Sequence, residues 1–293
     1  MKCQLCNEDD VKLIETKIRN LNTDEIKVYN CAKCGVHFLY PYFTEEELQS
    51  FYNGSYRKEY TEADYYSEQK IREFFNKSIS EAKERMKRIE RYLDIKDVIL
   101  EIGCSSGYFL NTLQDKVKSV NCTEWDEGNA NYCNSLGINV RKNIEDFNYK
   151  FDKIFMFHVL EHIKNPINFL IRLKDYMQDD GILFIEVPNN EDVLLNAYNI
   201  TEFRDFYYQS AHLWYFNRKS LAYTLNKAGY ECEIINIQRY DISNHINWLK
   251  NKRPGGQNMF DSIFDDKLKC AYNETLKKAN KTDTILAICK IER

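Results

Sequence analysis

The fold is decided by residues 98–110, which read VILEIGCSSGYFL. The short apolar run at 98–100 predicts a strand that is buried on both faces. A turn with glycines at 103 and 107 follows, and the apolar-periodic run 108–113 predicts a helix. Strand, glycine turn and helix form the first unit of a doubly wound sheet, which binds nucleotide-like ligands at its carboxyl edge. A turn without a ligand would have the same pattern, so both interpretations stay open at this point.

An acid follows the glycine turn at the distance typical of a ribose-binding residue. Gly103 and Gly107 have no Cβ, so the backbone and a ligand can approach closely there. Residues 120–124 read VNCTE and predict a second strand that ends in Glu124. Glu124 lies 124 − 103 = 21 residues after Gly103, close to the offset of about 20 residues of an acid that binds ribose hydroxyls. Together these features favour a ligand site over a structural turn.

Three further motifs continue the series: FDKI at 151–154, HVLEH at 158–162 and GILFIEVP at 181–188. In content and in order, the series resembles class I S-adenosylmethionine-dependent methyltransferases over roughly residues 80–240. That resemblance implies an α/β fold with a doubly wound, Rossmann-like sheet of seven strands, the last of them antiparallel. It also implies that the cofactor is S-adenosylmethionine.

The resemblance places the cofactor at the carboxyl ends of the first strands. Trp125, directly after the ribose acid, is expected to lie against the adenine, and residues 143 and 144 are expected to hold its edge. His158 is expected inside the fourth strand, residues 153–159, as a buried and hydrogen-bonded residue. The cofactor-binding residues implied by the resemblance are Glu101, Gly103, Cys104, Gly107, Glu124, Trp125, Asn143, Ile144 and His158.

Two Cys-x-x-Cys pairs near the N-terminus predict a metal site. Each pair can form a tight knuckle, and two knuckles make a tetrahedral thiolate site for a structural Zn²⁺. Its ligands would be Cys3, Cys6, Cys31 and Cys34. The β-like stretches 11–16 and 25–29 lie between the pairs, so residues 1–40 are interpreted as a zinc-ribbon module. A chance cluster of reduced thiols is the alternative.

The rest of the chain divides into a linker and a catalytic domain. Residues 41–66 are rich in tyrosine and resemble the linker of methyltransferases found among sugar-modifying enzymes, where it folds over cofactor and substrate. Residues 67–293 are predicted to form the methyltransferase domain, starting with a helix that has an apolar stripe. Within it, residues 188–216 are predicted to be a substrate-selecting lid and residues 243–281 a helical insertion.

The expected chemistry is an in-line displacement at the methyl group of a sulfonium, in which alignment and exclusion of water supply much of the acceleration. A hydroxyl acceptor also benefits from a base that titrates near neutral pH, which favours histidine. His162, just past the fourth strand, and His212, in the lid, are the candidate bases. Glu161 or a lid tyrosine would orient the acceptor. The alternative for each histidine is a structural role.

The zinc ribbon, tyrosine linker and lid histidine resemble sugar C-methyltransferases, in which a glutamate precedes the lid histidine. Ala211 stands in that place here, and only about 50 residues follow the sixth predicted strand. Both departures favour an oxygen acceptor on a sugar or nucleotide-linked sugar, and hence a role in carbohydrate biosynthesis. The alternatives are a sugar C-methyltransferase, an rRNA or tRNA methyltransferase with a zinc module, and a non-catalytic cofactor-binding scaffold. The intact glycine turn and Glu124 argue against a scaffold.

The composition and net charge of the chain limit the kinds of partner that the protein is expected to bind. The net charge of −4 in 293 residues argues against nucleic acid as a substrate. No apolar run approaches the ~20 residues of a membrane helix, and the N-terminus does not resemble a signal peptide, so a cytoplasmic location is expected. Ten cysteines then indicate metal ligation and free thiols rather than disulfides. A small-molecule partner is expected, and the oligomeric state stays open.

Overall fold

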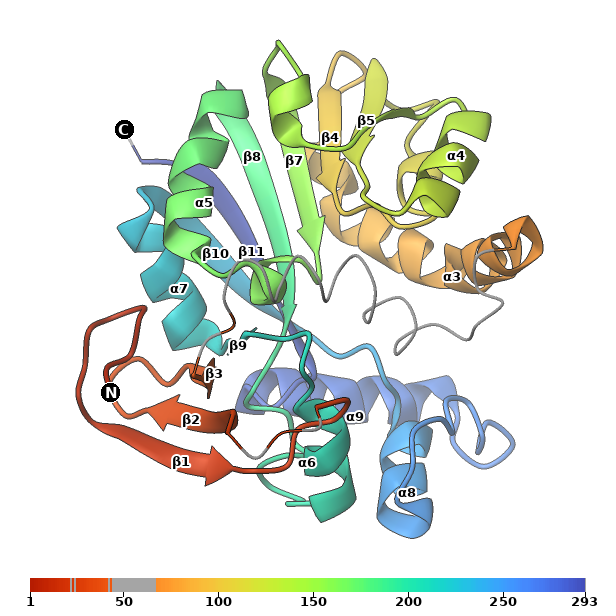
Figure 1. Ribbon diagram of the computed structural model, residues 1–293. Helices are drawn as coiled ribbons and strands as arrows, with labels where there is room; N and C mark the ends of the chain where they lie inside the picture. Colours follow the sequence, from red (N-terminus) through yellow and green to blue (C-terminus); the bar gives the residue numbers. More distant parts are fainter. Residues whose placement is uncertain (22, 24, 42, 44–66, 293) are drawn as a thin grey trace.

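A seven-stranded sheet forms the centre of the molecule (Figure 1). The structure is a computed structural model that describes residues 1–21, 23, 25–41, 43 and 67–292. The strand order is β10-β11-β8-β7-β4-β5-β6. The strands are β4 (Val98–Ile102), β5 (Ser119–Thr123), β6 (Asn139–Arg141), β7 (Phe151–Phe157), β8 (Met177–Pro188), β10 (Tyr230–Ile237) and β11 (Thr284–Ile291). β4 to β8 pair in parallel and β11 is antiparallel to both of its neighbours, which confirms the predicted fold class.

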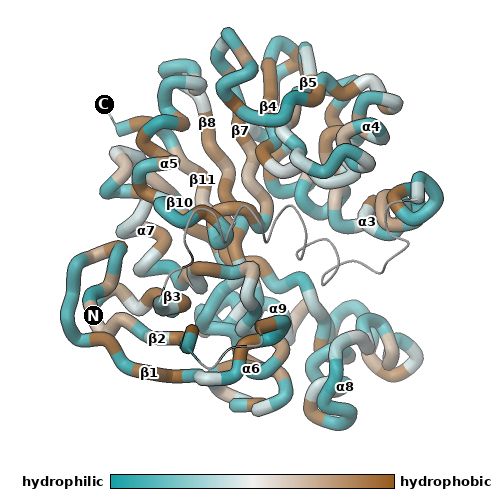
Figure 2. The backbone as a smooth tube through the Cα atoms, in the orientation of Figure 1, coloured by the Kyte–Doolittle hydropathy of each residue, from teal (hydrophilic) through white to brown (hydrophobic). Residues whose placement is uncertain are grey.

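Helices cover both faces of this sheet because its central strands are apolar on both sides. Along β7, Phe155 and Phe157 pack toward the helix α3 (Glu68–Ile89), whereas Ile154 and Met156 pack toward the opposite face. The opposite face is covered by α5 (Pro166–Leu173) and α7 (Arg218–Lys227), and α4 (Glu127–Ser135) lies beside α3. Figure 2 shows β7 and β8 as hydrophobic tubes between these layers. Among the described helices, none combines the length and the apolar character that a membrane span requires.

The N-terminal residues form a second, smaller sheet that includes a strand from far along the chain. Its order is β1-β2-β3-β9, and neighbouring strands are antiparallel. The first three strands are β1 (Val11–Glu15), β2 (Lys27–Cys31) and β3 (His37–Tyr40). β9 (Trp214–Tyr215) comes from the predicted lid and pairs with β3. The sequence did not predict this pairing, because two residues carry no usable period.

The predicted lid is largely packed. It contains α6 (Thr201–Tyr207), and the predicted helical insertion contains α8 (Ile242–Asn251) and α9 (Asp266–Ala279). One apolar cluster joins side chains of the N-terminal sheet, the lid and these helices: Ile18, Ile26, Val28, Leu39, Leu194, Phe203, Tyr208, Tyr215, Trp248 and Leu276. The second sheet is therefore packed against the rest of the chain through residues of the predicted lid and the two helices. Most of the predicted tyrosine-rich linker, residues 41–66, lies outside the described residues.

Two sequence predictions of local structure are wrong. Residues 108–113 do not form an α-helix but contain only the 3₁₀-helix Leu110–Thr112. The amide groups of Thr112 and Leu113 donate to residues three positions earlier, and the Thr112 hydroxyl also donates to the Phe109 carbonyl, which competes with helix propagation. His158 is not inside the strand: β7 ends one residue earlier, and His158 has a left-handed backbone with φ 58°. Its N–H donates to the Glu186 carbonyl oxygen, 2.8 Å away.

Candidate active site

The glycine turn after β4 accepts no larger residue at its two glycines. Gly103 and Gly107 have φ +71° and +72°, in the left-handed region. A Cβ on Gly103 would lie 2.9 Å from Val159 Cγ2, and one on Gly107 would lie 2.8 Å from Cys133 Sγ. The turn therefore needs glycine at both positions, and Val159 connects it to the loop that follows β7.

Glu124 closes the turn from the end of β5. Its two carboxylate oxygens accept hydrogen bonds from the backbone N–H groups of Ser105 and Asp126, each at 2.8 Å. Burial raises the pKa of Glu124 to about 7, against the two N–H donors, which lower it. A carboxylate has further lone pairs after two hydrogen bonds, so it can still accept from a ligand's hydroxyl groups.

Two further polar groups at the turn are buried without a hydrogen-bond partner among the described residues. They are Glu101 Oε2 and Ser106 Oγ, and their side chains are 3% and 0% exposed. Burial raises the pKa of Glu101 well above its usual value. An unpaired buried acceptor and hydroxyl beside a carboxylate fit a ligand with ribose hydroxyls and an amino-acid end, as S-adenosylmethionine has.

The remaining predicted cofactor residues flank the same edge of the sheet. The side chain of Trp125 is 58% exposed directly after Glu124. Asn143 precedes the short helix Ile144–Asp146, where it takes part in a capping box, and Ile144 is buried. A polar pocket of about 460 Å³ lies at the opposite, amino edge of β5 and β6 and contains none of the predicted site residues.

Glu161, His162 and His212 come together from two loops. Each offers one nitrogen or oxygen atom, and these atoms lie within 4.8 Å of one another. The rings of the two histidines meet edge to face, with centroids 4.8 Å apart. The first two residues belong to the short helix Leu160–His162 after β7, and the third precedes β9. The sequence predicted each of these residues, and the structure shows that they are neighbours.

The hydrogen bonds of the two histidines define which nitrogens carry hydrogen. His162 Nδ1 lies 2.8 Å from the Ala211 carbonyl oxygen, which can only accept, so the lone pair of the neutral ring is on Nε2. His212 Nε2 lies 2.8 Å from Gln209 Nε2, and the Gln209 oxygen accepts from Arg19. His212 Nε2 therefore accepts, and its hydrogen is on Nδ1. Burial lowers the pKa of His162 and, more strongly, that of His212, so both rings are neutral near pH 7.

A buried charge cluster at the same edge was missed by the sequence analysis. Arg85 and Glu186 are 3% and 1% exposed in their side chains and pair at 2.8 Å. The charge of Arg85 and a hydrogen bond from His158 hold the pKa of Glu186 well below its usual range, although burial opposes this. Arg239 lies 3.8 Å from Glu186 and also contacts His158. A signal was present: Arg85 lies on the apolar stripe of its helix and Glu186 lies in an apolar strand, so neither fits a solvated role.

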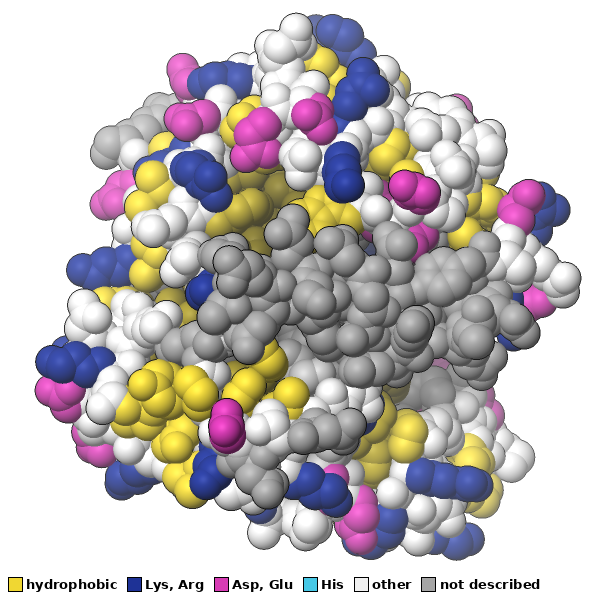
Figure 3. Space-filling model, viewed as in Figure 1, with side chains coloured by type: hydrophobic (Ala, Val, Ile, Leu, Met, Phe, Trp, Pro, Cys, Tyr) yellow, Lys and Arg dark blue, Asp and Glu magenta, His cyan; other side chains and the backbone are white. Residues whose placement is uncertain are grey.

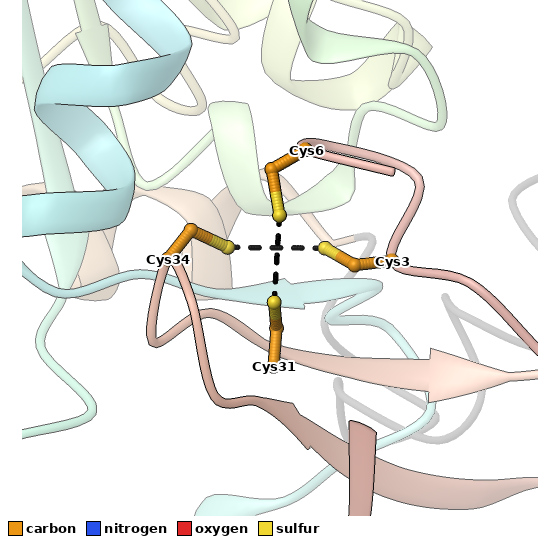
Figure 4. Close-up of side chains that lie close together, drawn as sticks. All are labelled: Cys3, Cys6, Cys31 and Cys34. Carbon is orange, nitrogen blue, oxygen red and sulfur yellow. Dashed lines mark hydrogen bonds between the residues drawn. The ribbon is translucent and has the colours of Figure 1, made fainter. Parts of the chain in front are cut away.

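The four N-terminal cysteines point at one centre (Figure 4). Cys3 Sγ and Cys34 Sγ are 3.8 Å apart, and Cys6 Sγ and Cys31 Sγ are 3.4 Å apart. In a tetrahedral Zn²⁺ site with Zn–S bonds of about 2.3 Å, the sulfurs would be about 3.8 Å apart. The cluster is therefore consistent with a zinc site, as the sequence predicted.

The fold and the turn define the class of protein. A parallel sheet with an antiparallel last strand, a glycine turn and a carboxylate at its edge is the architecture of an enzyme that binds a nucleoside cofactor. The chain belongs to the methyltransferase domain family, which matches residues 56–234. It is an S-adenosylmethionine-dependent methyltransferase, as predicted.

Solved structures share the fold at low sequence identity. A SAM-dependent methyltransferase from Archaeoglobus fulgidus is 19% identical with a TM-score of 0.52, covering 74% of this chain and 96% of that one. The DhpI–SAM–HEP complex is 12% identical with a TM-score of 0.51, covering 85% and 100%. The plantazolicin methyltransferase BpumL in complex with SAH is 14% identical with a TM-score of 0.51, covering 85% and 99%. No curated protein matches the chain.

Proposed function

We propose that the protein transfers a methyl group from S-adenosylmethionine to a hydroxyl of a sugar or nucleotide-linked sugar. The observation that carries this proposal is the group formed by Glu161, His162 and His212. Val159 joins this group to the glycine turn, since its Cγ2 approaches the site of a Gly103 Cβ to 2.9 Å. A cofactor at the turn would therefore have its acceptor beside two imidazoles and a carboxylate.

The bound cofactor supplies an electrophilic methyl on a sulfonium, and the side chains manage the acceptor's proton. His162 Nε2 carries the lone pair, so His162 takes the proton as the acceptor oxygen forms its bond to the methyl carbon. His212 presents an Nδ1–H and orients the acceptor by donating to it. Glu161 accepts a hydrogen bond from a second hydroxyl. The electron pair of the S–CH₃ bond would stay on the sulfur of a bound cofactor.

Ala211, the residue before His212, supports an oxygen atom as the methyl acceptor. Ala211 is 2% exposed, and its carbonyl holds His162, so this position offers no acid for deprotonating carbon. Nucleic acid fits poorly with a net charge of −4, and on the face shown in Figure 3 the visible basic and acidic side chains are interspersed. The proposal of a sugar substrate is supported by the resemblance of the N-terminal module and linker to those of sugar-modifying enzymes.

The test is a screen of nucleotide-sugars with labelled cofactor. Label found on carbon, nitrogen or RNA would contradict the assignment of a sugar hydroxyl as the acceptor.

We expect the Glu124→Ala variant to bind S-adenosylmethionine at least tenfold more weakly, which corresponds to about 1.4 kcal/mol. The carboxylate would accept from the ribose hydroxyls, and it also holds the amide of Ser105 at 2.8 Å. Its loss leaves hydroxyls unpaired and loosens the turn. Calorimetric titration measures the change. Glu127→Ala, an exposed acid on α4, is the matched control, and equal affinities in all three proteins would exclude Glu124 from the site.

Cofactor affinity should also rise with pH through about 7, the pKa to which burial raises Glu124. The sign follows from the raised pKa: below it the carboxyl is protonated, and only the ionised form can accept from both ribose hydroxyls. We expect the dissociation constant to fall about tenfold between pH 6 and pH 8, in proportion to the ionised fraction. Glu124→Gln should flatten this dependence. A dependence of the same size in Glu124→Gln would assign the titration to another group.

A further inference from the structure

We propose that Glu161, His162 and His212 form a second metal site, which binds a divalent transition-metal ion beside the glycine turn. Their ligand atoms lie within 4.8 Å of one another, and small side-chain adjustments bring them into one coordination sphere. Two imidazoles and a carboxylate are a ligand set that Zn²⁺, Mn²⁺ and Fe²⁺ accept, with positions left open for substrate. The site is separate from the cysteine cluster in its residues and in its ligand chemistry.

The carboxylate of Glu161 supplies the strongest evidence. Its side chain is 0% exposed, and neither oxygen has a hydrogen-bond partner among the described residues. His158 Nδ1 lies 3.4 Å from Oε1 and forms an ion pair with it when the imidazole is protonated. A buried carboxylate with unused lone pairs is costly unless something positive binds it. A divalent ion would satisfy both the charge and the lone pairs.

The backbone holds the ligands in place before any ion binds. The Leu213 N–H donates to the Glu161 carbonyl at 2.9 Å, and the Trp214 indole donates to the Ile163 carbonyl at 2.9 Å. These bonds fix the loop after β7 against the loop before β9. His162 donates from Nδ1 to a carbonyl, the outer-shell contact typical of metal-binding histidines, which directs Nε2 at the ion.

His212 can join the ligand set through Nδ1, because its Nε2 points at Gln209. The ring must then carry its hydrogen on Nε2, and Gln209 must turn its amide oxygen to accept that hydrogen. Arg19, which donates to this oxygen, opposes the turn. A carboxylate at position 209 would accept from both partners and favour the ligand tautomer.

The adjacent group formed by Glu81, His158 and Glu186 does not make an equivalent site, although its atoms are also close together. Arg85 lies 2.9 Å from Glu81 and 2.8 Å from Glu186, and Arg239 lies 3.6 Å and 3.8 Å from the same two acids. Two arginines therefore already balance the two carboxylates. Glu161 has no arginine partner among the described residues and only the titratable His158 beside it, at 3.4 Å, which is why the ion is placed there.

Binding of the ion is independent of the acceptor, whereas its role in the reaction rests on the proposed function. An acceptor hydroxyl at an open position of the ion would become more acidic. The methyl carbon would leave sulfur and bond to that oxygen, and the proton would pass to solvent. His162 Nε2, the proton acceptor of the metal-free site, would serve as a ligand in the metal-bound site.

The test uses the full chain with its cysteine cluster intact. Protein stripped of weakly held ions is titrated with Mn²⁺, followed by the loss of the free-ion resonance signal, and in parallel with Zn²⁺ by calorimetry. Mn²⁺ is the cleaner probe, because thiolates bind it poorly. We expect one ion per chain in addition to any zinc at the cysteines. Failure of both ions to bind would overturn the proposal, whatever the methyl acceptor is.

Variants locate the ion. Glu161→Gln, which keeps the shape, should weaken Mn²⁺ and Zn²⁺ binding at least tenfold, whereas Glu202→Gln, an exposed acid that pairs with Lys252, should leave it unchanged. Gln209→Glu should tighten binding by roughly tenfold, the scale of outer-shell effects on metal affinity. This gain cannot result from misfolding. Unchanged affinity in both Glu161→Gln and Gln209→Glu would place the ion elsewhere and overturn the assignment.

Discussion

Removing zinc from the cysteine cluster, or replacing Cys31 by serine, should unfold the N-terminal sheet and lower kcat by at least tenfold. The sheet is too small to have a sufficient core of its own, and binding of zinc to such modules supplies on the order of 10 kcal/mol of folding free energy. Cys31 is 0% exposed at the end of β2, so its loss removes a ligand that solvent cannot replace. We expect about one zinc per chain at these cysteines.

The effect should reach the methyl-transfer site because the module holds one of its loops. β3 pairs with β9, where Phe38 lies opposite Trp214, and the Leu39 N–H donates to the Leu213 carbonyl at 3.1 Å. The Gly35 carbonyl accepts from Asn190 at 2.9 Å. His212 immediately precedes this paired segment, so an unfolded module would release it. The glycine turn and Glu124 are held by other elements, so cofactor affinity should change much less than kcat.

Elemental analysis, circular dichroism and turnover measured on one preparation check this chain of effects. Cys270→Ser is the matched control, because Cys270 is exposed on α9 and lies outside the cluster. It should keep the zinc and full turnover. An ordered N-terminal sheet in protein free of metal would refute the structural role of zinc. Full kcat in a protein whose N-terminal sheet has unfolded would show that this sheet does not hold His212 in position.

The sequence was most informative where chemistry and local backbone coincide. Gly103, Gly107 and Glu124 follow from a turn that needs left-handed backbone and from the fixed offset of an acid. The central strands β4, β7 and β8 were predictable because each contains an apolar run next to a turn signal. The number of seven strands was implied by the family resemblance, since β6, with the sequence NVR, has no such run. The four cysteines were predictable because the spacing of metal ligands is a local property.

What the sequence could not supply depends on contacts between distant residues. β9 is a strand only because β3 lies beside it, and the salt bridge of Arg85 and Glu186 joins residues 101 positions apart. The helix predicted after Gly107 failed because burial of Phe109 and a side-chain bond from Thr112 favour a tighter turn. In each case tertiary packing overrides local preference, and a single sequence carries no record of it.

Replacing His162 by alanine should lower kcat by about 10²–10⁴ and leave the affinity for S-adenosylmethionine nearly intact. The Ala211 carbonyl accepts from His162 Nδ1, so the lone pair of the neutral ring is on Nε2. Without added metal, that nitrogen is the proposed proton acceptor, and with an ion bound it is a ligand. Both uses are lost in the variant. Retention of full kcat would show that His162 has neither role.

The His212→Ala variant distinguishes proton transfer by His162 from binding of a metal ion at the same site. In protein stripped only of weakly held ions, with its cysteine cluster intact, His212 only orients the acceptor through its Nδ1–H, so the variant should mainly raise KM. In metal-loaded protein the same variant loses a ligand and should lower kcat as His162→Ala does. His245→Gln is the control, since this buried histidine bonds to Tyr272 and Gln238, away from the site. Steady-state kinetics on the acceptor found in the nucleotide-sugar screen, with and without Mn²⁺, distinguish the cases. One outcome would assign both roles: kcat falls in His212→Ala only when metal is present, and in His162→Ala with or without metal. It would identify His162 as the proton acceptor and both histidines, whose ring centroids lie 4.8 Å apart, as ligands of the ion.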